Sequence, residues 1–431
     1  MSSRPGQPSV DDGGSDLDHA SAKWPLAGSG VAALFMAFAF GYFLSALLRA
    51  IVATLAPVLA AELALSASSL GLLAGAYFLG FALMQLPLGS ALDRYGPRRV
   101  LLTLMTLAVI GCVAFSLARS LGQLVLARLL IGIGVAASLM APLTAFVRLV
   151  EPSVQLRLNA WMLMTGSLGM VASTVPVQLL LPLTGWRGLF AAVGALLLLA
   201  MAAIAWVAPR AAPRHAEEAA GHYREIVRHP AFVQAWPLGF FAYAGLIAMQ
   251  SLWAGPWMTQ VGGATPDEAA RGLFFINLSM LVSFFAWGVA MPRLVRRGIT
   301  ADRLIGALWV VGPLVLALVI ALGPLAGAPA WALWCVSTSV VTLIQPAVAQ
   351  KFPSHRAGRA LSAFNLVIFL GVFVNQWAIG LAIDVLAAFG LDTVTRFRVA
   401  FGLLLLATLW AGIWYRRHGG GRPASAQPGG R

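Results

Sequence analysis

The sequence has 431 residues, of which 60% are hydrophobic and 10% are charged, and its formal net charge is +14. A soluble domain carries about 25% charged and about 45–50% apolar residues, so this composition excludes an ordinary soluble fold and indicates a chain surrounded by lipid. The Lys and Arg residues lie in short clusters between apolar runs, which excludes the continuous basic face of a nucleic-acid-binding domain.

The two cysteines, Cys112 and Cys335, lie inside apolar runs and are too few for a disulfide framework or a zinc site. The sequence also lacks an arrangement of a nucleophile with a base. We therefore expect no catalytic residues, no metal and no cofactor, and the protein is not predicted to be an enzyme.

The first half of the chain predicts a short tail followed by six membrane-spanning helices. Residues 1–30 are polar and lack a basic segment followed by an apolar one, so they predict a disordered cytoplasmic tail and no cleaved signal peptide. Residues 31–208 then contain six apolar windows of about twenty residues or more, the length that crosses a bilayer as a helix. These windows lie near residues 31–60, 68–92, 99–118, 121–147, 158–182 and 187–208.

The second half repeats this arrangement after the longest polar interruption, residues 209–230, which predict a cytoplasmic linker. Residues 231–416 contain a second set of six windows, near residues 232–259, 271–292, 302–323, 329–350, 359–384 and 396–415, and residues 417–431 predict a disordered cytoplasmic tail. The sequence therefore predicts an all-α membrane protein with twelve transmembrane helices in two pseudo-symmetric six-helix bundles.

The basic residues are distributed unequally between the two sets of loops. One set holds Arg94, Arg98, Arg99, Arg148, Arg157, Arg293, Arg296, Arg297, Arg303, Lys351, Arg356 and Arg359, and the opposite set offers only Arg119, Arg187, Arg271, Arg396 and Arg398. Because cytoplasmic loops carry an excess of Lys and Arg, we expect both termini to be cytoplasmic and the protein to reside in the cytoplasmic (inner) membrane.

An internal repeat supports two equivalent halves. The run Gly89-x4-Arg94-x3-Arg98 recurs as Gly288-x4-Arg293-x3-Arg297 at a constant offset of 199 residues. Parallel repeats of this kind build transporters whose site lies between the halves at the middle of the membrane.

The loop run Gly89-x3-Asp93-Arg94-x-Gly96-x-Arg98-Arg99 resembles a signature of the major facilitator superfamily, and Leu124-x3-Arg128-x3-Gly132-x-Gly134 resembles the fourth-helix motif of that superfamily. The resemblance implies secondary transport by a major facilitator fold. It further implies that Asp93 and Arg94 form a latch between the halves, that Gly89 allows close helix packing and Gly96 a tight turn, and that Arg98 holds the loop. Arg128 is expected to have a structural or coupling role.

Arg49 is one of two charges that lie clearly inside an apolar window; the other is Arg128. A charge at that depth is costly, so a functional role is the default hypothesis. The run Leu48-Arg49-x7-Pro57 resembles helix one of the organic anion and organophosphate branches, in which this arginine contacts the anion. The seventh window has no basic residue that could pair with a second negative charge. This favours a carboxylate with one charge over a phosphate ester with two. The alternative interpretation is that the donors of Arg49 are hydrogen-bonded by backbone carbonyls or water and bind no substrate.

A set of polar and aromatic residues recurs at helical spacing around the middle of the predicted spans, and we expect it to line a substrate site together with Arg49. It consists of Tyr42, Tyr77, Gln85, Tyr243, Gln250, Asn277, Gln345 and Asn365. The amides need hydrogen-bond partners, either one another or a ligand.

The sequence therefore predicts a monomeric secondary transporter of a small organic anion, with protons as a possible coupling ion. The alternative is a drug or metabolite/proton antiporter working as an exporter. Exporters of this superfamily carry a Gly-Pro-Gly-Gly-like run on helix five, whereas the corresponding run begins Thr165-Gly166-Ser-Leu-Gly169. A non-transporting receptor in the same fold is a further possibility, because fold does not fix function.

Overall fold

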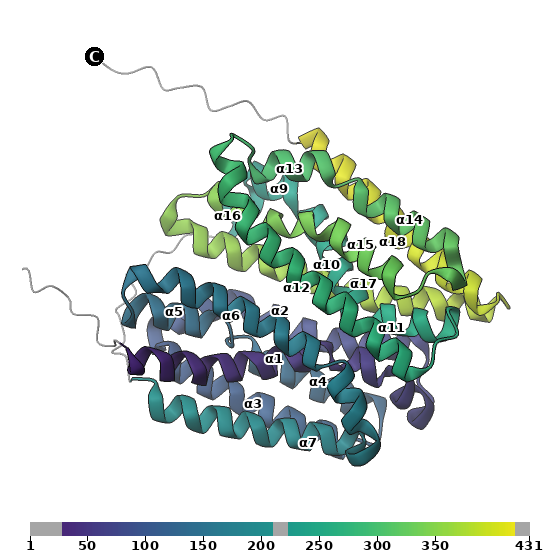
Figure 1. Ribbon diagram of the computed structural model, residues 1–431, viewed down its shortest axis with the longest axis horizontal. Helices are drawn as coiled ribbons and strands as arrows, with labels where there is room; N and C mark the ends of the chain where they lie inside the picture. Colours follow the sequence, from purple (N-terminus) through teal and green to yellow (C-terminus); the bar gives the residue numbers. More distant parts are fainter. Residues whose placement is uncertain (1–27, 210–222, 419–431) are drawn as a thin grey trace, which may run out of the picture.

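The computed structural model describes residues 28–209 and 223–418. Most of the two tails and of the linker predicted from the sequence therefore lies outside the described residues. Within the described part of the chain the regular structure is entirely helical. The helices of the N-terminal half and those of the C-terminal half form two groups that lie side by side (Figure 1).

The N-terminal half begins with three helices that each match one predicted window. Four further helices make up the next three spans. In chain order the helices of this half are α1 (Ser29–Leu63), α2 (Ala67–Tyr95), α3 (Pro97–Leu117), α4 (Leu121–Val135), α5 (Met140–Leu149), α6 (Pro152–Ala172) and α7 (Val175–Val207). Together α4 and α5 make the fourth span. Gly185 has a φ of 63° and divides α7 into two helical parts, so that α6 and the first part of α7 correspond to the fifth predicted span and the rest of α7 to the sixth.

The C-terminal half has the same number of spans but more interruptions. The short α8 (Tyr223–Arg228) precedes a seventh span made of α9 (Pro230–Pro237), η1 (Leu238–Tyr243), α10 (Ala244–Ala248), η2 (Met249–Trp253), α11 (Ala254–Pro256) and η3 (Trp257–Val261). The remaining helices are α12 (Pro266–Arg296), α13 (Ala301–Leu308), α14 (Val311–Leu322), η4 (Gly323–Leu325), α15 (Ala328–Thr338), η5 (Ser339–Leu343), α16 (Ile344–Gln350), α17 (Ser354–Ala388) and α18 (Thr393–His418).

Eleven helical segments in the described residues are long and apolar enough to cross a membrane, and α6 lies between two of them as a further helix. The segment Val175–Val207 contains the turn at Gly185. When its first part is joined with α6 as the fifth span and the rest is taken as the sixth, the count agrees with a twelve-helix fold. Large apolar side chains such as Leu117, Leu199, Phe285 and Leu406 are exposed on the outside of the bundle. An apolar exterior of this extent is the surface that lipid covers.

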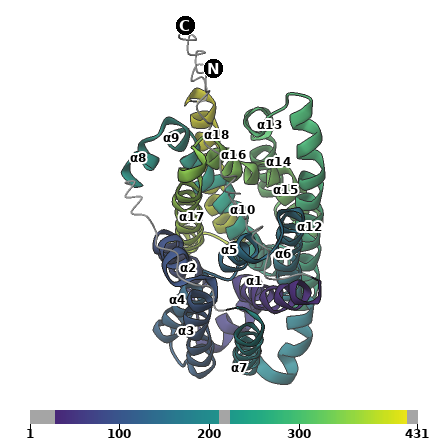
Figure 2. The same cartoon turned by 90° about the vertical axis from the view of Figure 1, so that its left-hand side faces the viewer.

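Seen along the bundle, α3 and α7 lie on the far side of the N-terminal half, and α1, α2, α5 and α6 lie toward the C-terminal half (Figure 2). One end of the bundle, where α2, α5, α12 and α16 end and α3 begins, carries Arg94, Arg98, Arg148, Arg296 and Lys351, and we call it the basic end. Loops that follow α1, α3 and α7's first part lie at the opposite end, where Glu62 accepts a hydrogen bond from Trp186 Nε1 at 2.6 Å and pairs with Arg187.

The two halves meet closely at the opposite end. Asp384 at the end of α17 accepts hydrogen bonds from the backbone N–H groups of Ala67 and Ser68, at 3.0 and 2.8 Å. A carboxylate in this place satisfies free N–H groups at the start of α2 and interacts favourably with its helix dipole. Gln178 donates to Asp267 at 2.9 Å between α7 and α12. These contacts fix one end of the interface, and the candidate site lies between them and the basic end.

Candidate functional site

Arg49 lies on α1 in the interface between the two halves and is partly exposed. The guanidinium carbon is 5.7 Å from the ring centre of Phe81 on α2 and 5.9 Å from that of Phe369 on α17. Both distances lie within the range of a cation–π interaction. Among the described residues, the Nε of Arg49 has no hydrogen-bond partner. The guanidinium is therefore held by aromatic faces from both halves and retains a free donor.

Three tyrosines surround this arginine. Tyr42, Tyr77 and Tyr243 interact electrostatically with Arg49 and come from α1, α2 and η1. The hydroxyl of Tyr77 donates to the carbonyl of Ser45 at 3.2 Å, which ties α2 to α1 one turn from Arg49. The structure thus brings together the predicted residues Arg49, Tyr42, Tyr77 and Tyr243 around one charge.

Arg128 on α4 lies behind this site and is fully buried. Its Nη1 donates to the carbonyl of Leu48 at 2.6 Å, and its guanidinium carbon is 4.8 Å from the ring centre of Tyr77. Gly132, one turn further along α4, lies directly against the backbone carbonyl of Tyr77, where a β-carbon would clash. Arg128 therefore binds the backbone next to Arg49 and supports the wall of the site.

The predicted amide residues form two separate hydrogen-bonded groups. In the first, Gln250 Nε2 donates to Asn277 Oδ1 at 2.7 Å, inside the C-terminal half. In the second, Gln345 donates to Asn365, and Asn365 Nδ2 donates to Gln85 Oε1 at 3.2 Å. Gln85 belongs to α2, so the second group joins the two halves.

The seventh span supplies Tyr243 and Gln250 from segments with π-helical hydrogen bonding, η1 and η2. A π turn inserts an extra residue into the helix and changes the direction of the side chains that follow, and it occurs often at functional sites. Neither side chain can therefore be placed correctly by a strict 3.6-residue period. This span lies against α1 and α17 at the centre of the interface (Figure 2).

The predicted latch residues lie at the basic end. Among the described residues, the ion pair of Asp93 is with Arg148 on α5, at 3.2 Å and in the same half, and Arg94 stacks over Tyr95. Arg98 donates to the carbonyl of Ala205. Gly96 has a φ of 80° and makes the turn between α2 and α3. A latch from Asp93 and Arg94 to the C-terminal half is not formed in this conformation and stays a prediction for another one.

Gly89 departs from its expected role. A β-carbon at this position would have no atom within 4 Å, so in this conformation the residue does not bring two helices together. Gly71 and Gly380 do bring the two halves together, since they lie against the backbones of Gln376 and Ala67. The close approach therefore occurs at the opposite end of α2.

Phe81 and Phe369 belong to the site but were not expected from the sequence. Their ring centres are 4.5 Å apart across the interface. Aromatic residues are common in apolar spans, and nothing in their spacing distinguishes these two. A contact with a charged residue on another helix is visible only in three dimensions.

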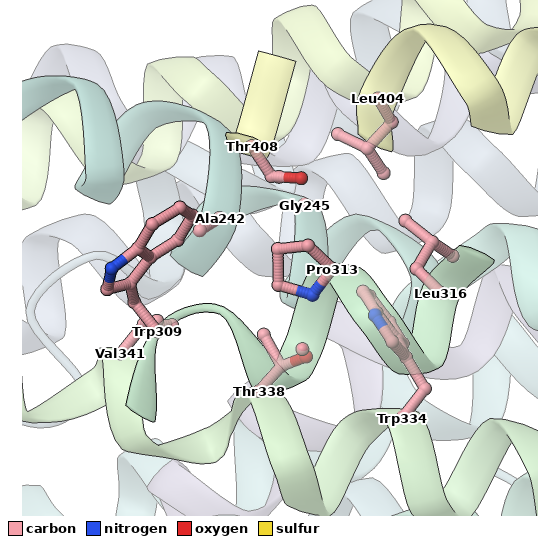
Figure 3. A pocket seen from close by; sticks show the side chains of 11 residues that line it. Ala242, Gly245, Trp309, Pro313, Leu316, Trp334, Thr338, Val341, Leu404 and Thr408 are labelled. Carbon is pink, nitrogen blue, oxygen red and sulfur yellow. The ribbon is translucent and has the colours of Figure 1, made fainter. Parts of the chain in front are cut away.

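A small cavity lies elsewhere, inside the C-terminal half between η1, α10, α14, α15 and α18 (Figure 3). Its volume is about 10 Å³, and Trp309, Pro313, Leu316, Trp334 and Thr338 are among the residues around it. This is room for about one water molecule, so it cannot hold an organic solute. Among the described residues no group of His, Cys, Asp and Glu could hold a metal ion.

Comparison with known proteins gives a consistent picture. Residues 38–376 match the family model of the Major Facilitator Superfamily. The fold is similar to a bacterial homolog of the human lysosomal transporter Spinster in an inward-facing, unoccupied conformation, with a TM-score of 0.74 and 18% identity over 91% of this chain and 98% of that one. A D-xylose–proton symporter gives a TM-score of 0.69 and 18% identity over 89% and 97% of the two chains.

The xylose transporter XylE from E. coli, in a partially occluded inward-open conformation, is similar with a TM-score of 0.67 and 14% identity, over 90% of this chain and 98% of that one. At such identities these likenesses establish the fold and leave the solute to be argued from the site.

Proposed function

The chain belongs to the Major Facilitator Superfamily, and from this membership we propose that it is a secondary transporter that moves a small organic anion with a single negative charge. The halves rock against each other about a fixed site between them, as parallel-repeat carriers do. The one observation that carries the choice of an anion is the position of Arg49, a permanent positive charge at the interface of the halves with an unpaired buried donor.

A guanidinium suits this role because it stays charged and presents a planar set of donors that matches a carboxylate. A charge inside the membrane is costly unless it is paired. The aromatic faces of Phe81 and Phe369 offset part of that cost, and a bound carboxylate would offset more. We propose that Tyr42, Tyr77 and Tyr243 line the same site.

The side chains of the C-terminal half indicate how many negative charges the solute carries. The seventh span, Pro230–Val261, contains no Lys, Arg or His. The C-terminal half offers instead the neutral amides Gln250, Asn277, Gln345 and Asn365. A monocarboxylate with a neutral body matches one guanidinium and several neutral groups better than a phosphate ester with two charges does.

We propose further that the basic end faces the cytoplasm, since cytoplasmic loops of membrane proteins are enriched in Lys and Arg. Both termini then lie in the cytoplasm and the protein resides in the inner membrane as a monomer. Transport is driven either by protons or by exchange for a second anion.

A thermal-shift screen of the purified protein tests this proposal. The ligand set comprises carboxylates, phosphates, amino acids and cationic drugs, and a ligand that binds the folded state raises the melting temperature with the logarithm of its concentration. We expect stabilisation by monocarboxylates. Stabilisation by cationic drugs alone, unchanged in Arg49→Ala, would contradict the proposal and favour a drug exporter.

A further inference from the structure

The contact between Arg49 and Phe369 joins the two halves through a charge. Phe369 lies on α17 and packs in the interface against two aromatic residues of α2, with ring-centre distances of 4.5 Å to Phe81 and 6.3 Å to Phe78. Its ring is also the aromatic face of the C-terminal half that lies over the Arg49 guanidinium, at 5.9 Å, while Tyr243 of the same half interacts with Arg49 electrostatically. The interface is thus held partly by a ring that faces a permanent cation.

The strength of such a contact depends on the net charge of the guanidinium. The attraction arises from the quadrupole of the ring acting on a positive charge. An anion that pairs with the guanidinium cancels most of that charge and competes for the same electrostatic field. The attraction between Arg49 and Phe369 is therefore strong without an anion and weak with one.

We propose that Phe369 is a positioning residue that couples the occupancy of Arg49 to the movement of the halves. This inference rests on the proposed function, because it assigns the anion the task of neutralising Arg49. Without an anion, the cation–π contact stabilises the conformation described above, in which Asp384 also holds the start of α2. A bound anion weakens the contact and frees α17 to move relative to α1 and α2.

The transport mode follows from this coupling. When the empty form of a carrier is stabilised in one conformation, the change to the opposite-facing conformation is slow without a solute and fast with one. The protein therefore favours exchange of one anion for another over net movement. Among the described spans, Arg49 is the interface charge that a solute can neutralise, and Phe369 contacts it from the opposite half, next to Tyr243.

A double-mutant cycle in the absence of any ligand tests the coupling. Spin labels are placed at Leu183→Cys and Phe389→Cys, which lie at the opposite end in different halves and are 80% and 76% exposed. The buried Cys112 and Cys335 are replaced by alanine. Distance distributions are then measured in the otherwise unchanged protein, in Arg49→Gln, in Phe369→Leu and in the variant with both substitutions.

Each single substitution removes the same contact, so we expect each to lower the population of the described conformation relative to others by about 2- to 30-fold, the range of a cation–π contact. The double variant should show no change beyond that of Arg49→Gln, which also removes the interaction with Tyr243. Phe369→Tyr keeps an aromatic face and should retain the original distribution, whereas Phe369→Met should behave like Phe369→Leu. Phe78→Leu, which removes a ring that packs on Phe369, should change the ratio by less than about 2-fold, the lower limit of that range.

Equal distributions in all four proteins, or additive effects of the two substitutions, would overturn the coupling. Because no ligand is present, such a result leaves anion binding by Arg49 untouched. A ligand screen that favoured cations would, conversely, overturn the proposed solute and leave the measured contact in place.

Discussion

Two arginines enter the membrane interior of the N-terminal half, and their surroundings differ in kind. Arg128 is fully buried, donates to the carbonyl of Leu48 and lies against Tyr77, so every contact comes from its own half. Arg49 is partly exposed and lies between aromatic rings of both halves. Among the described residues, the Nε of both arginines and the Nη2 of Arg128 have no hydrogen-bond partner, so the exposure and the partners distinguish the two charges. The first charge is enclosed by its own half, and the second lies at the interface between the two halves.

The difference indicates that the two charges have different roles. A buried cation bound to a backbone carbonyl fixes the helix that carries that carbonyl, and Leu48 is the residue before Arg49. Arg128 therefore determines where Arg49 lies. In the proposed function it is Arg49, at the interface and with aromatic partners, that binds the solute.

The largest expected effect separates the two arginines directly. Arg49→Gln should weaken binding of the best monocarboxylate by about 30- to 4,000-fold, because loss of one partner of a desolvated charge pair costs about 2–5 kcal/mol. Arg128→Gln should weaken it by less than about 10-fold, or about 1.4 kcal/mol, since the hydrogen bond and the aromatic contact that it loses are made to the protein and not to the ligand. Calorimetric titration of the two purified variants measures both values.

Melting temperature provides the control for this pair. Arg128→Gln should lower it more than Arg49→Gln does, because Arg128 is fully buried and donates to a backbone carbonyl, whereas Arg49 is partly exposed. Equal losses of affinity in the two variants would remove the distinction between a supporting and a binding arginine.

A smaller effect tests the close packing of α4 against α2, near the enclosed Arg128. Gly132→Ala places a β-carbon against the backbone carbonyl of Tyr77, so α2 and α4 must separate, and overpacking of this kind costs about 1–3 kcal/mol. The matched control is Gly89→Ala, the same substitution where a β-carbon has no atom within 4 Å. There the melting temperature should stay constant or rise, because alanine is the better helix former. A drop of equal size at both positions would show that the contact at Gly132 has no special role.

Much of the fold can be predicted from the sequence because lipid imposes long apolar segments. The predicted windows and the helices agree in order, and the disagreements have local causes. Gly185 turns the chain with a φ of 63° inside what is otherwise one helical run, and the hydrogen bonding of the seventh span changes to π geometry at η1 and η2. Hydropathy averages over such turns and cannot detect them.

The candidate site is predictable only in part. Arg49 and Arg128 are visible because a charge in an apolar window is rare. The partners of the amides are not visible, because Gln345, Asn365 and Gln85 come from three helices that are far apart in the chain. Phe81 and Phe369 are hidden for a different reason: a phenylalanine in an apolar span carries no signal until its neighbours are known.

Asp384 illustrates how a sequence position can be found and its partner missed. Its place at the end of the predicted window 359–384 is evident from the sequence. In the structure it binds the free N–H groups at the start of α2, in the other half of the molecule. That contact depends on how the halves dock, which no local pattern encodes.

The most direct measurement is a structure of the protein with the most stabilising monocarboxylate in brominated form, using the anomalous signal of bromine to locate it. We expect the carboxylate oxygens within about 2.7–3.2 Å of the Arg49 guanidinium, the range of a hydrogen bond, and Arg128 still donating to Leu48. A ligand bound away from Arg49, with that guanidinium still in contact with Phe81 and Phe369 and with no ligand atom beside it, would contradict the central claim.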